Sequence, residues 1–485
     1  MNRSITKNYL YNLSYQVFVI LAPLITTPYI SRVLGVKNVG TYNYAQSIVD
    51  IFILIGCIGL NLYGQRQIAY VSDKPAERSR AFWELEVLRV LTLTVTAVVF
   101  IFSVVNRAEN QRIYWFLFIE IAASVLDINW FFQGLENFKI IAIRNFVVKS
   151  LGILAIFLFV KNEQQLDIYC LCYAATLLLG NLSLWVYLPK QLVRIPLKSL
   201  RIFSHFLPSL VIFIPQIATS IYTMLDKTMI GLLSDDYQVS YYSQGEKVVK
   251  LALTIVVSLS LIMLSRVAKS FAEDKLDEVK GSLIQSFRLV FLLGFPITLG
   301  LIGIAPDMVQ WFFGDGYEPV IPVMMVISPI VLFIGLSGVT GTQFLVPTKR
   351  MKEYSGSVAV GMGINVILNF FLIRLLGSIG ASIASVIAEF SVMALQVFFV
   401  RKDFEWKLLK PAWKNAVSAV IMLDCIFASR LILPHNYWLT TAVQITGGFA
   451  IYAVCLLLLR DDFALSLLNT VISKIPFLNK LSSDK

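Results

Sequence analysis

Charged residues and histidine are scarce in this sequence. Asp, Glu, Lys and Arg make up 15% of its 485 residues, and there are only two histidines. A soluble domain carries about 25% charged residues. Hydrophobic residues reach 57%, which leaves too little polar side chain to cover a water-facing surface and excludes a soluble fold. The phosphate-binding pattern GxxxxGK[ST] is absent, so ATP hydrolysis at a P-loop is excluded as well.

Cysteine is also rare. The five cysteines lie inside apolar runs, and none has a histidine at metal-ligand spacing; they are Cys57, Cys170, Cys172, Cys425 and Cys455. We interpret them as small buried hydrophobic side chains, and we expect no metal and no cofactor. The net charge of +11 comes from basic residues clustered in short loops. Membrane topology and an anionic membrane surface explain that clustering, so we expect no nucleic-acid partner.

Long apolar runs fill most of the chain. A membrane-spanning helix needs about 20 apolar residues, because the hydrocarbon core is about 30 Å thick. We therefore predict an all-α integral membrane protein with about fourteen transmembrane helices. They are expected at residues 9–30, 40–62, 82–105, 113–132, 141–160, 167–188, 206–231, 246–264, 283–305, 320–342, 356–376, 379–400, 414–433 and 438–459. The first run is long and lacks a cleavage pattern, so it is predicted to stay as a permanent helix.

Basic residues are strongly biased to one set of alternate loops. Lys and Arg are common in the first set, which includes the termini and the loop 189–204, and rare in the other. Because cytoplasmic loops carry the excess of Lys and Arg, both termini are predicted to be cytoplasmic. The loop 306–319 has acids but no Lys or Arg and is predicted to lie outside.

The helices are expected to form two like halves. Gly40-Thr-Tyr-Asn43 aligns with Ser240-Tyr-Tyr-Ser243, each at the start of the second helix of a six-helix set. Such parallel repeats suit alternating access around a cleft; chance similarity of two polar turns is the alternative. The predicted divisions are an N-lobe at 1–190, a basic linker at 191–204, a C-lobe at 205–402, two further helices at 403–460 and an amphipathic cytoplasmic tail at 461–485.

Four short motifs carry a resemblance to a known family. They are Pro28-Tyr-Ile-Ser-Arg-Val-Leu-Gly35 with Gly40-Thr-Tyr42, Asp127-Ile-Asn129-Trp130 with Gln133-Gly134, Asp226-Lys227 with Tyr242-Ser-Gln-Gly-Glu-Lys247, and Gly341-Thr-Gln343 with Pro347-Thr-Lys349. Together with the length and helix plan, they resemble Wzx-type polysaccharide flippases of the MOP superfamily, which also holds the MATE drug exporters.

This resemblance implies a function and a location. It implies a transporter, not an enzyme, that moves an undecaprenyl-pyrophosphate-linked oligosaccharide from the inner to the outer leaflet of the bacterial cytoplasmic membrane, for surface polysaccharide synthesis. The implied partners are that substrate, membrane lipids, and possible contacts with a polysaccharide polymerase and glycosyltransferases. A MATE-like antiporter of drugs or metabolites is the nearest alternative, and a membrane-bound polymerase is a more distant one.

Basic residues inside the predicted spans are candidates for binding the pyrophosphate. A charge at mid-bilayer costs about 2.5–3.5 kcal/mol, so its default interpretation is functional, and Lys and Arg both bind phosphate. The candidates are Lys247, Lys250, Arg89, Lys149, Lys227 and Arg32. Two alternatives stay open: Arg89 can reach the cytoplasmic surface, and Lys250 can pair with Glu246 one turn away.

Acidic residues inside the spans are candidates for ion coupling. A carboxylate in such a site can carry a proton or bind Na⁺. The candidates are Asp50, Glu120, Asp226 and Glu389, with Asp50 and Glu120 preferred, and the choice between Na⁺ and H⁺ is open. The family motifs add six residues expected to be structural: Asp127, Asn129, Trp130, Gly134, Gly40 and Tyr42.

Overall fold

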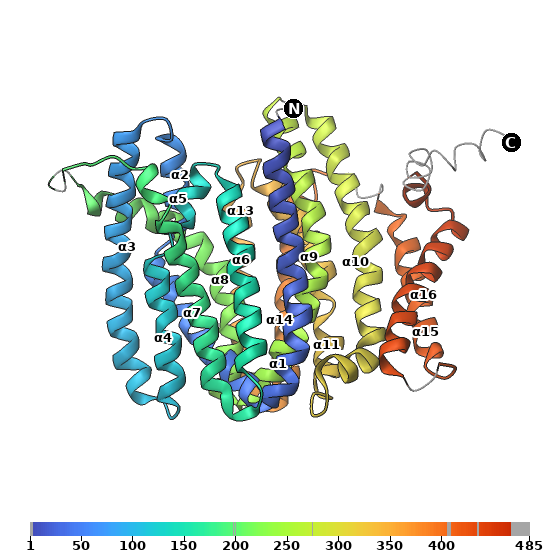
Figure 1. The fold of residues 1–485 in the computed structure, drawn as a ribbon. Helices are drawn as coiled ribbons and strands as arrows, with labels where there is room; N and C mark the ends of the chain where they lie inside the picture. Colours follow the sequence, from blue (N-terminus) through green and yellow to red (C-terminus); the bar gives the residue numbers. More distant parts are fainter. Residues whose placement is uncertain are drawn as a thin grey trace. The chain divides into compact units, whose positions relative to one another are not determined.

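The computed structural model describes residues 3–466 except 197, 199, 274, 405–408 and 434–435. Side chains are also left undescribed at 3–20, 214–223, 259–262, 265, 266, 268, 272 and 276. Every regular element in this part of the chain is a helix, as Figure 1 shows, which confirms the all-α prediction.

The α-helices are α1 (Arg3–Cys57), α2 (Leu60–Tyr70), α3 (Pro75–Ser103), α4 (Gln111–Val125), α5 (Asn129–Gly134), α6 (Phe138–Phe159), α7 (Leu166–Trp185), α8 (Phe206–Leu233), α9 (Asp236–Ala272), α10 (Leu276–Phe313), α11 (Val320–Ile327), α12 (Ile330–Ser337), α13 (Met351–Leu376), α14 (Ser378–Val400), α15 (Ala412–Ser429) and α16 (Tyr437–Leu458). Shorter helical turns are η1 (Val105–Arg107), η2 (Glu163–Gln165), η3 (Leu188–Lys190), η5 (Ile202–His205) and the π-helix η6 (Gly338–Leu345).

Helix α1 is a pair of spans joined at a glycine. A straight helix of its 55 residues would be about 80 Å long, far beyond the membrane core. The helix bends at Gly35, whose φ of 70° and ψ of 171° are not helical. A side chain at this φ would be strained, which explains why glycine occupies the turn between the two spans predicted at 9–30 and 40–62.

Three predicted spans have different ends or breaks in the structure. The span predicted at 113–132 ends at Val125, and α5 begins a new short helix at Asn129. The span predicted at 320–342 is divided into α11, α12 and η6, with Pro329 at the first division. Helix α10 runs to Phe313, so the residues 306–313, predicted as an outer loop, are helical.

Eleven helices in the described part of the chain are long and apolar enough to cross a membrane. One of these eleven stretches, Leu21–Tyr70, contains the bend at Gly35. Helices α8 and α9, which contain undescribed side chains, are not among the eleven. The membrane-spanning class is therefore established, and the count of about fourteen stays a prediction.

The chain divides by packing into two compact units, residues 1–240 and 241–485. In the first unit α6 and α7 pack together, α4 packs on α7, and α1 contacts α3, α4, α6 and α8 (Figure 1). One apolar core of this unit centres on Leu93, Phe100 and Leu117, and a second on Phe82, Trp130 and Phe131. The predicted lobe boundary at 191–204 rests on internal repetition, a different criterion, and stays a prediction.

In the second unit α13 and α14 form a closely packed pair, and α11 and α12 pack against α14. Helices α15 and α16 pack against each other and both against α10. Of the predicted amphipathic tail at 461–485, residues 462–466 are helical, and the remainder lies outside the described residues.

Candidate functional site

Two of the predicted ion-coupling acids share one amide in the first unit. The side-chain nitrogen of Gln46 donates to Asp50 Oδ1 at 2.9 Å and to Glu120 Oε2 at 2.8 Å. Gln46 and Asp50 are one turn apart on α1, and Glu120 comes from α4. An amide nitrogen has two hydrogens, so both bonds can form at once. The structure thus brings together the two acids that the sequence favoured.

This acid–amide cluster, defined by Gln46, Asp50 and Glu120, has acceptor oxygens without donors. Glu120 is 2% exposed, and its Oε1 atom and Gln46 Oε1 are both buried without a hydrogen-bond partner among the described residues. Buried polar atoms are nearly always satisfied by protein, water or an ion. A proton, a water molecule or a small cation would therefore complete the cluster.

Tyr42 lies one turn before Gln46 on α1, and Lys227 lies on α8, which packs against α1. Tyr42 is buried, and its ring meets Tyr169 edge-on at 4.7 Å between centroids, with Tyr173 at 6.0 Å. Tyr42 was predicted from the motif to be structural, and its ring packing fits that role. Lys227 on α8 precedes Thr228, whose hydroxyl lies 2.8 Å from that of Ser47 on α1. Its neighbour Asp226 is 2% exposed.

Gly40 allows the backbone of α1 to approach the turn between α8 and α9. A Cβ atom at Gly40 would lie 1.7 Å from the carbonyl oxygen of Asp236. The adjacent Thr41 hydroxyl donates to the Asp236 carboxylate at 2.5 Å. Further along α1, the hydroxyls of Ser47 and Thr228 are 2.8 Å apart. These contacts hold α8, which carries Lys227, against the helix that carries Asp50.

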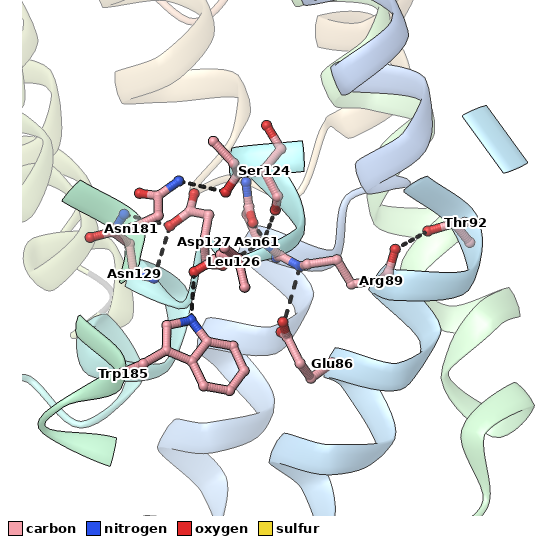
Figure 2. A network of polar contacts seen from close by, with 11 residues as sticks. Asn61, Glu86, Arg89, Thr92, Ser124, Leu126, Asp127, Asn129, Asn181 and Trp185 are labelled. Carbon is pink, nitrogen blue, oxygen red and sulfur yellow. Dashed lines mark hydrogen bonds and ion pairs between the residues drawn. The ribbon is translucent and has the colours of Figure 1, made fainter. Parts of the chain in front are cut away.

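Arg89 is part of a second, separate polar network in the first unit. Its guanidinium is 1% exposed and donates to the Asp127 carbonyl at 2.5 Å and to the Asn61 side chain. Glu86 Oε2 lies 4.0 Å from Arg89 Nε, and the Trp130 ring lies 5.6 Å below the guanidinium carbon. Figure 2 shows Arg89 reaching across from α3 to the turn after α4.

The network satisfies the backbone where α4 ends. The last carbonyls of a helix lack partners within the helix, and in a membrane they must be paired by other groups. Asn181 donates to the Ala123 carbonyl at 2.7 Å, and Trp185 to the Leu126 carbonyl at 2.9 Å. With the Arg89 bond, these make the α4–α5 corner a stable irregular turn (Figure 2).

The remaining motif residues shape the same corner. Asp127 Oδ1 accepts from the backbone of Asn129 at 3.0 Å and from its side chain at 2.5 Å. Trp130 is 2% exposed and stacks on Phe82 with the ring planes 17° apart. A Cβ atom at Gly134 would lie 2.7 Å from the Gln65 carbonyl, so only glycine fits there. These contacts fit the structural role predicted for the motif.

The other predicted cations of the first unit lie apart in the fold. Arg32 is exposed on α1, close before the bend at Gly35. Lys149 is half-buried on α6. Their predicted role in substrate binding stays a prediction.

The second unit holds the two lysines that were favoured most. Lys250 Nζ lies 2.6 Å from Glu246 Oε1, with Lys250 41% and Glu246 5% exposed. The pairing that the sequence left open is therefore present. Lys247 is half-buried one turn before Lys250 on α9. Glu389 is half-buried on α14, one turn after Ser385, which hydrogen-bonds Tyr242 at 3.1 Å. The roles proposed for these residues stay predictions.

The sequence interpretation missed the neutral partners. It searched the spans for charged residues, so it passed over Gln46 and Asn61. The signal for Gln46 was its spacing of one turn before Asp50. Glu86 was also missed, although it lies three residues before Arg89, on the same face of α3.

Comparison with solved structures shows which proteins share this fold. A lipid II flippase MurJ in an inward closed conformation matches 93% of this chain and 99% of its own, with a TM-score of 0.71 and 17% identity. An inward-facing multidrug MATE transporter of the MOP superfamily matches 81% of this chain and 97% of its own, with a TM-score of 0.63 and 11% identity. The chain shares its fold with both of these membrane transporters.

Family models match most of the chain. The model described as "Polysaccharide biosynthesis protein" matches residues 5–265, and that described as "Lipid II flippase MurJ" matches residues 136–449. The chain belongs to the polysaccharide biosynthesis protein family, as the motifs indicated. A putative O-antigen transporter of Escherichia coli (strain K12) is 24% identical over 82% of this chain and 97% of its own length.

Proposed function

We propose that this protein is a flippase that carries a lipid-linked oligosaccharide from the inner to the outer leaflet of the bacterial cytoplasmic membrane. The observation that carries the proposal is the match of the polysaccharide biosynthesis family model over more than half of the chain. It is supported by similarity to a putative O-antigen transporter over nearly that protein's whole length, and by the fold shared with a lipid II flippase.

In this proposal the chain acts as a transporter and not as an enzyme. Two lobes expose the substrate site alternately to the two sides of the membrane. The cationic residues Lys247, Lys250, Lys149, Lys227 and Arg32 are the proposed contacts for the pyrophosphate, because a phosphate crossing oil needs fixed positive charge. Arg89 is proposed to act through the α4–α5 corner, since its side chain is 1% exposed and bonded to that turn.

The acid–amide cluster is the proposed coupling site. Two carboxylates on one amide repel each other when both are ionised, and a proton or a Na⁺ ion would remove that repulsion. The two buried oxygens without donors give such an ion a place to bind. Asp226 and Glu389 remain weaker candidates. No other cofactor is proposed.

The termini are proposed to be cytoplasmic, and a polysaccharide polymerase and glycosyltransferases are proposed as partners. These enzymes would consume the flipped product and supply the substrate. A membrane-bound polymerase is the enzymatic alternative, and it is tested by whether purified protein extends lipid-linked glycan.

A MATE-like antiporter is the second candidate, favoured by the match to a multidrug MATE transporter at a lower TM-score of 0.63. Deletion of the gene in its host separates the two. A flippase deletion strain accumulates lipid-linked repeat units and loses surface glycan, and the gene supplied in trans restores it. Continued glycan export by the deletion strain, together with cationic dye uptake by vesicles carrying the protein, would instead establish the antiporter.

A further inference from the structure

Helices α6 and α7 of the first unit enclose a groove that no step of the proposed transport uses. The two helices touch closely where a Cβ atom at Gly152 would lie 2.7 Å from Thr176 and one at Gly180 would lie 2.9 Å from Val148. Beyond the Gly180 contact, toward the start of α6 and the end of α7, a cavity of about 590 Å³ opens.

Much of the wall of this α6–α7 groove is apolar and exposed in the first unit. Its lining includes Ile143, Val147, Val186 and Tyr187, which are between 44% and 75% exposed. In a membrane protein such side chains contact lipid acyl chains, not water. The groove is therefore shaped to take an acyl chain.

Two cationic side chains are part of the lining of the groove. Lys139 and Arg144 both line it. Lys139 is exposed and forms no ion pair among the described residues. Arg144 donates to the Gly180 carbonyl at 2.6 Å and to the Asn181 side chain at 2.8 Å. These bonds hold the guanidinium of Arg144 against α7.

We propose that the α6–α7 groove binds an anionic glycerophospholipid of the surrounding bilayer. The phosphate lies between Lys139 and Arg144, and one acyl chain lies along Ile143 and Val147. Basic pockets between transmembrane helices are suited to anionic lipid head groups. The positive charge of Lys139 and Arg144 selects an anionic head group. The apolar wall adds affinity for an acyl chain of any lipid.

The test is native mass spectrometry of the purified full-length protein with phosphatidylglycerol or phosphatidylcholine of identical acyl chains. We expect more phosphatidylglycerol bound than phosphatidylcholine. Lys139→Ala should weaken phosphatidylglycerol binding by about fivefold, because one cation near an anionic lipid contributes about 1 kcal/mol. Val147→Trp, which fills the groove, should remove binding of both lipids.

Lys161→Ala is the matched control, since Lys161 is an exposed cation beyond the opposite end of α6 and should leave binding unchanged. Equal binding of the two lipids, or wild-type binding by both Lys139→Ala and Val147→Trp, would overturn the proposal. Displacement of phosphatidylglycerol by an equal concentration of undecaprenyl phosphate would assign the groove to the substrate's lipid and overturn it as well. Gel filtration of each variant confirms that it is folded.

Discussion

At the residue scale, the acid–amide cluster depends on one neutral side chain. Gln46 supplies the donor for both Asp50 and Glu120, and the atoms it leaves unsatisfied are acceptors. Replacing Asp50 or Glu120 would change the electrostatics and the hydrogen-bond geometry of the cluster together. Replacing Gln46 changes the hydrogen bonds and leaves both carboxylates in place, so it is the sharper probe.

Gln46→Leu should abolish coupled transport. The substitution removes a donor from two carboxyl groups, and a lost partner for a buried polar group costs about 1–3 kcal/mol. We expect loss of surface glycan in cells, with the amount of protein in the membrane near that of the wild type. The control is Asn43→Leu one turn earlier on α1, where the side chain donates to the Val39 carbonyl at 2.8 Å. Wild-type export by Gln46→Leu would rule out the cluster as the coupling site.

The double substitution Lys247→Ala with Lys250→Ala should leave the protein inserted but stop flipping. Removing Lys250 alone would take away the cation that lies 2.6 Å from the Glu246 carboxylate, which is 5% exposed. The variant is therefore made with Glu246→Gln as well, and Glu246→Gln alone is its control. Glycan export is measured by surface labelling. Normal export from the triple variant would remove these lysines from the substrate site.

At the element scale, the α4–α5 corner explains why a buried arginine is retained on α3. Helix α4 stops at Val125, and its free carbonyls are paired by side chains from α3 and α7. A charge is expensive in this setting unless its hydrogens are used. Close packing at the same corner explains the glycine at 134. It also explains the glycine at 64, because a Cβ atom there would lie 2.6 Å from the Trp130 ring.

Arg89→Leu should destabilise the protein strongly. It removes the donor to the Asp127 carbonyl and to the Asn61 side chain, and each lost partner of a buried polar group costs about 1–3 kcal/mol. The expected result is a lower melting temperature in detergent, measured by intrinsic fluorescence. Arg107→Leu, at an exposed position in η1, serves as the control. An unchanged melting temperature with lost transport would point instead to a direct contact between Arg89 and substrate.

Gly40→Ala should disturb the contact between α1 and the α8–α9 turn. The added Cβ would overlap the Asp236 carbonyl, a backbone atom that cannot rotate away. Overpacking of this kind costs about 1–3 kcal/mol or more. Gly363→Ala on α13 is the matched control, because nothing lies within 4 Å of its added Cβ. Equal melting temperatures for the two variants would contradict the close approach.

At the scale of the whole molecule, the distribution of Lys and Arg between alternate loops predicts which side of the membrane each loop faces. Alkaline phosphatase is active only outside the cytoplasm. Fusing it to this protein within a given loop therefore reports on which side of the membrane that loop lies. We expect an inactive fusion after Lys349 and an active one after Asp315. The reverse pattern would invert the predicted topology, and activity at both sites would mean that a span between them is miscounted.

Much of the architecture followed from composition. Apolar runs longer than the membrane core is thick require helices, because only a helix pairs its own backbone in oil. The class and most of the spans were therefore predictable, and the family motifs indicated the fold. The break after Val125, the division at Pro329 and the helical residues 306–313 were not, because hydropathy averages over about 20 residues and does not register where hydrogen bonding changes.

The sequence by itself determined that this protein lies in a membrane, which family it resembles and which charged residues are candidates for the site. Each of these depends on residue type and local spacing. Only the tertiary structure decided which of those residues meet. Gln46 hydrogen-bonds both Asp50 and Glu120, whereas Arg89 hydrogen-bonds the backbone of the turn after α4. The physical reason is that hydrogen bonds act within about 3 Å, and such distances between helices are fixed by packing and not by position along the chain.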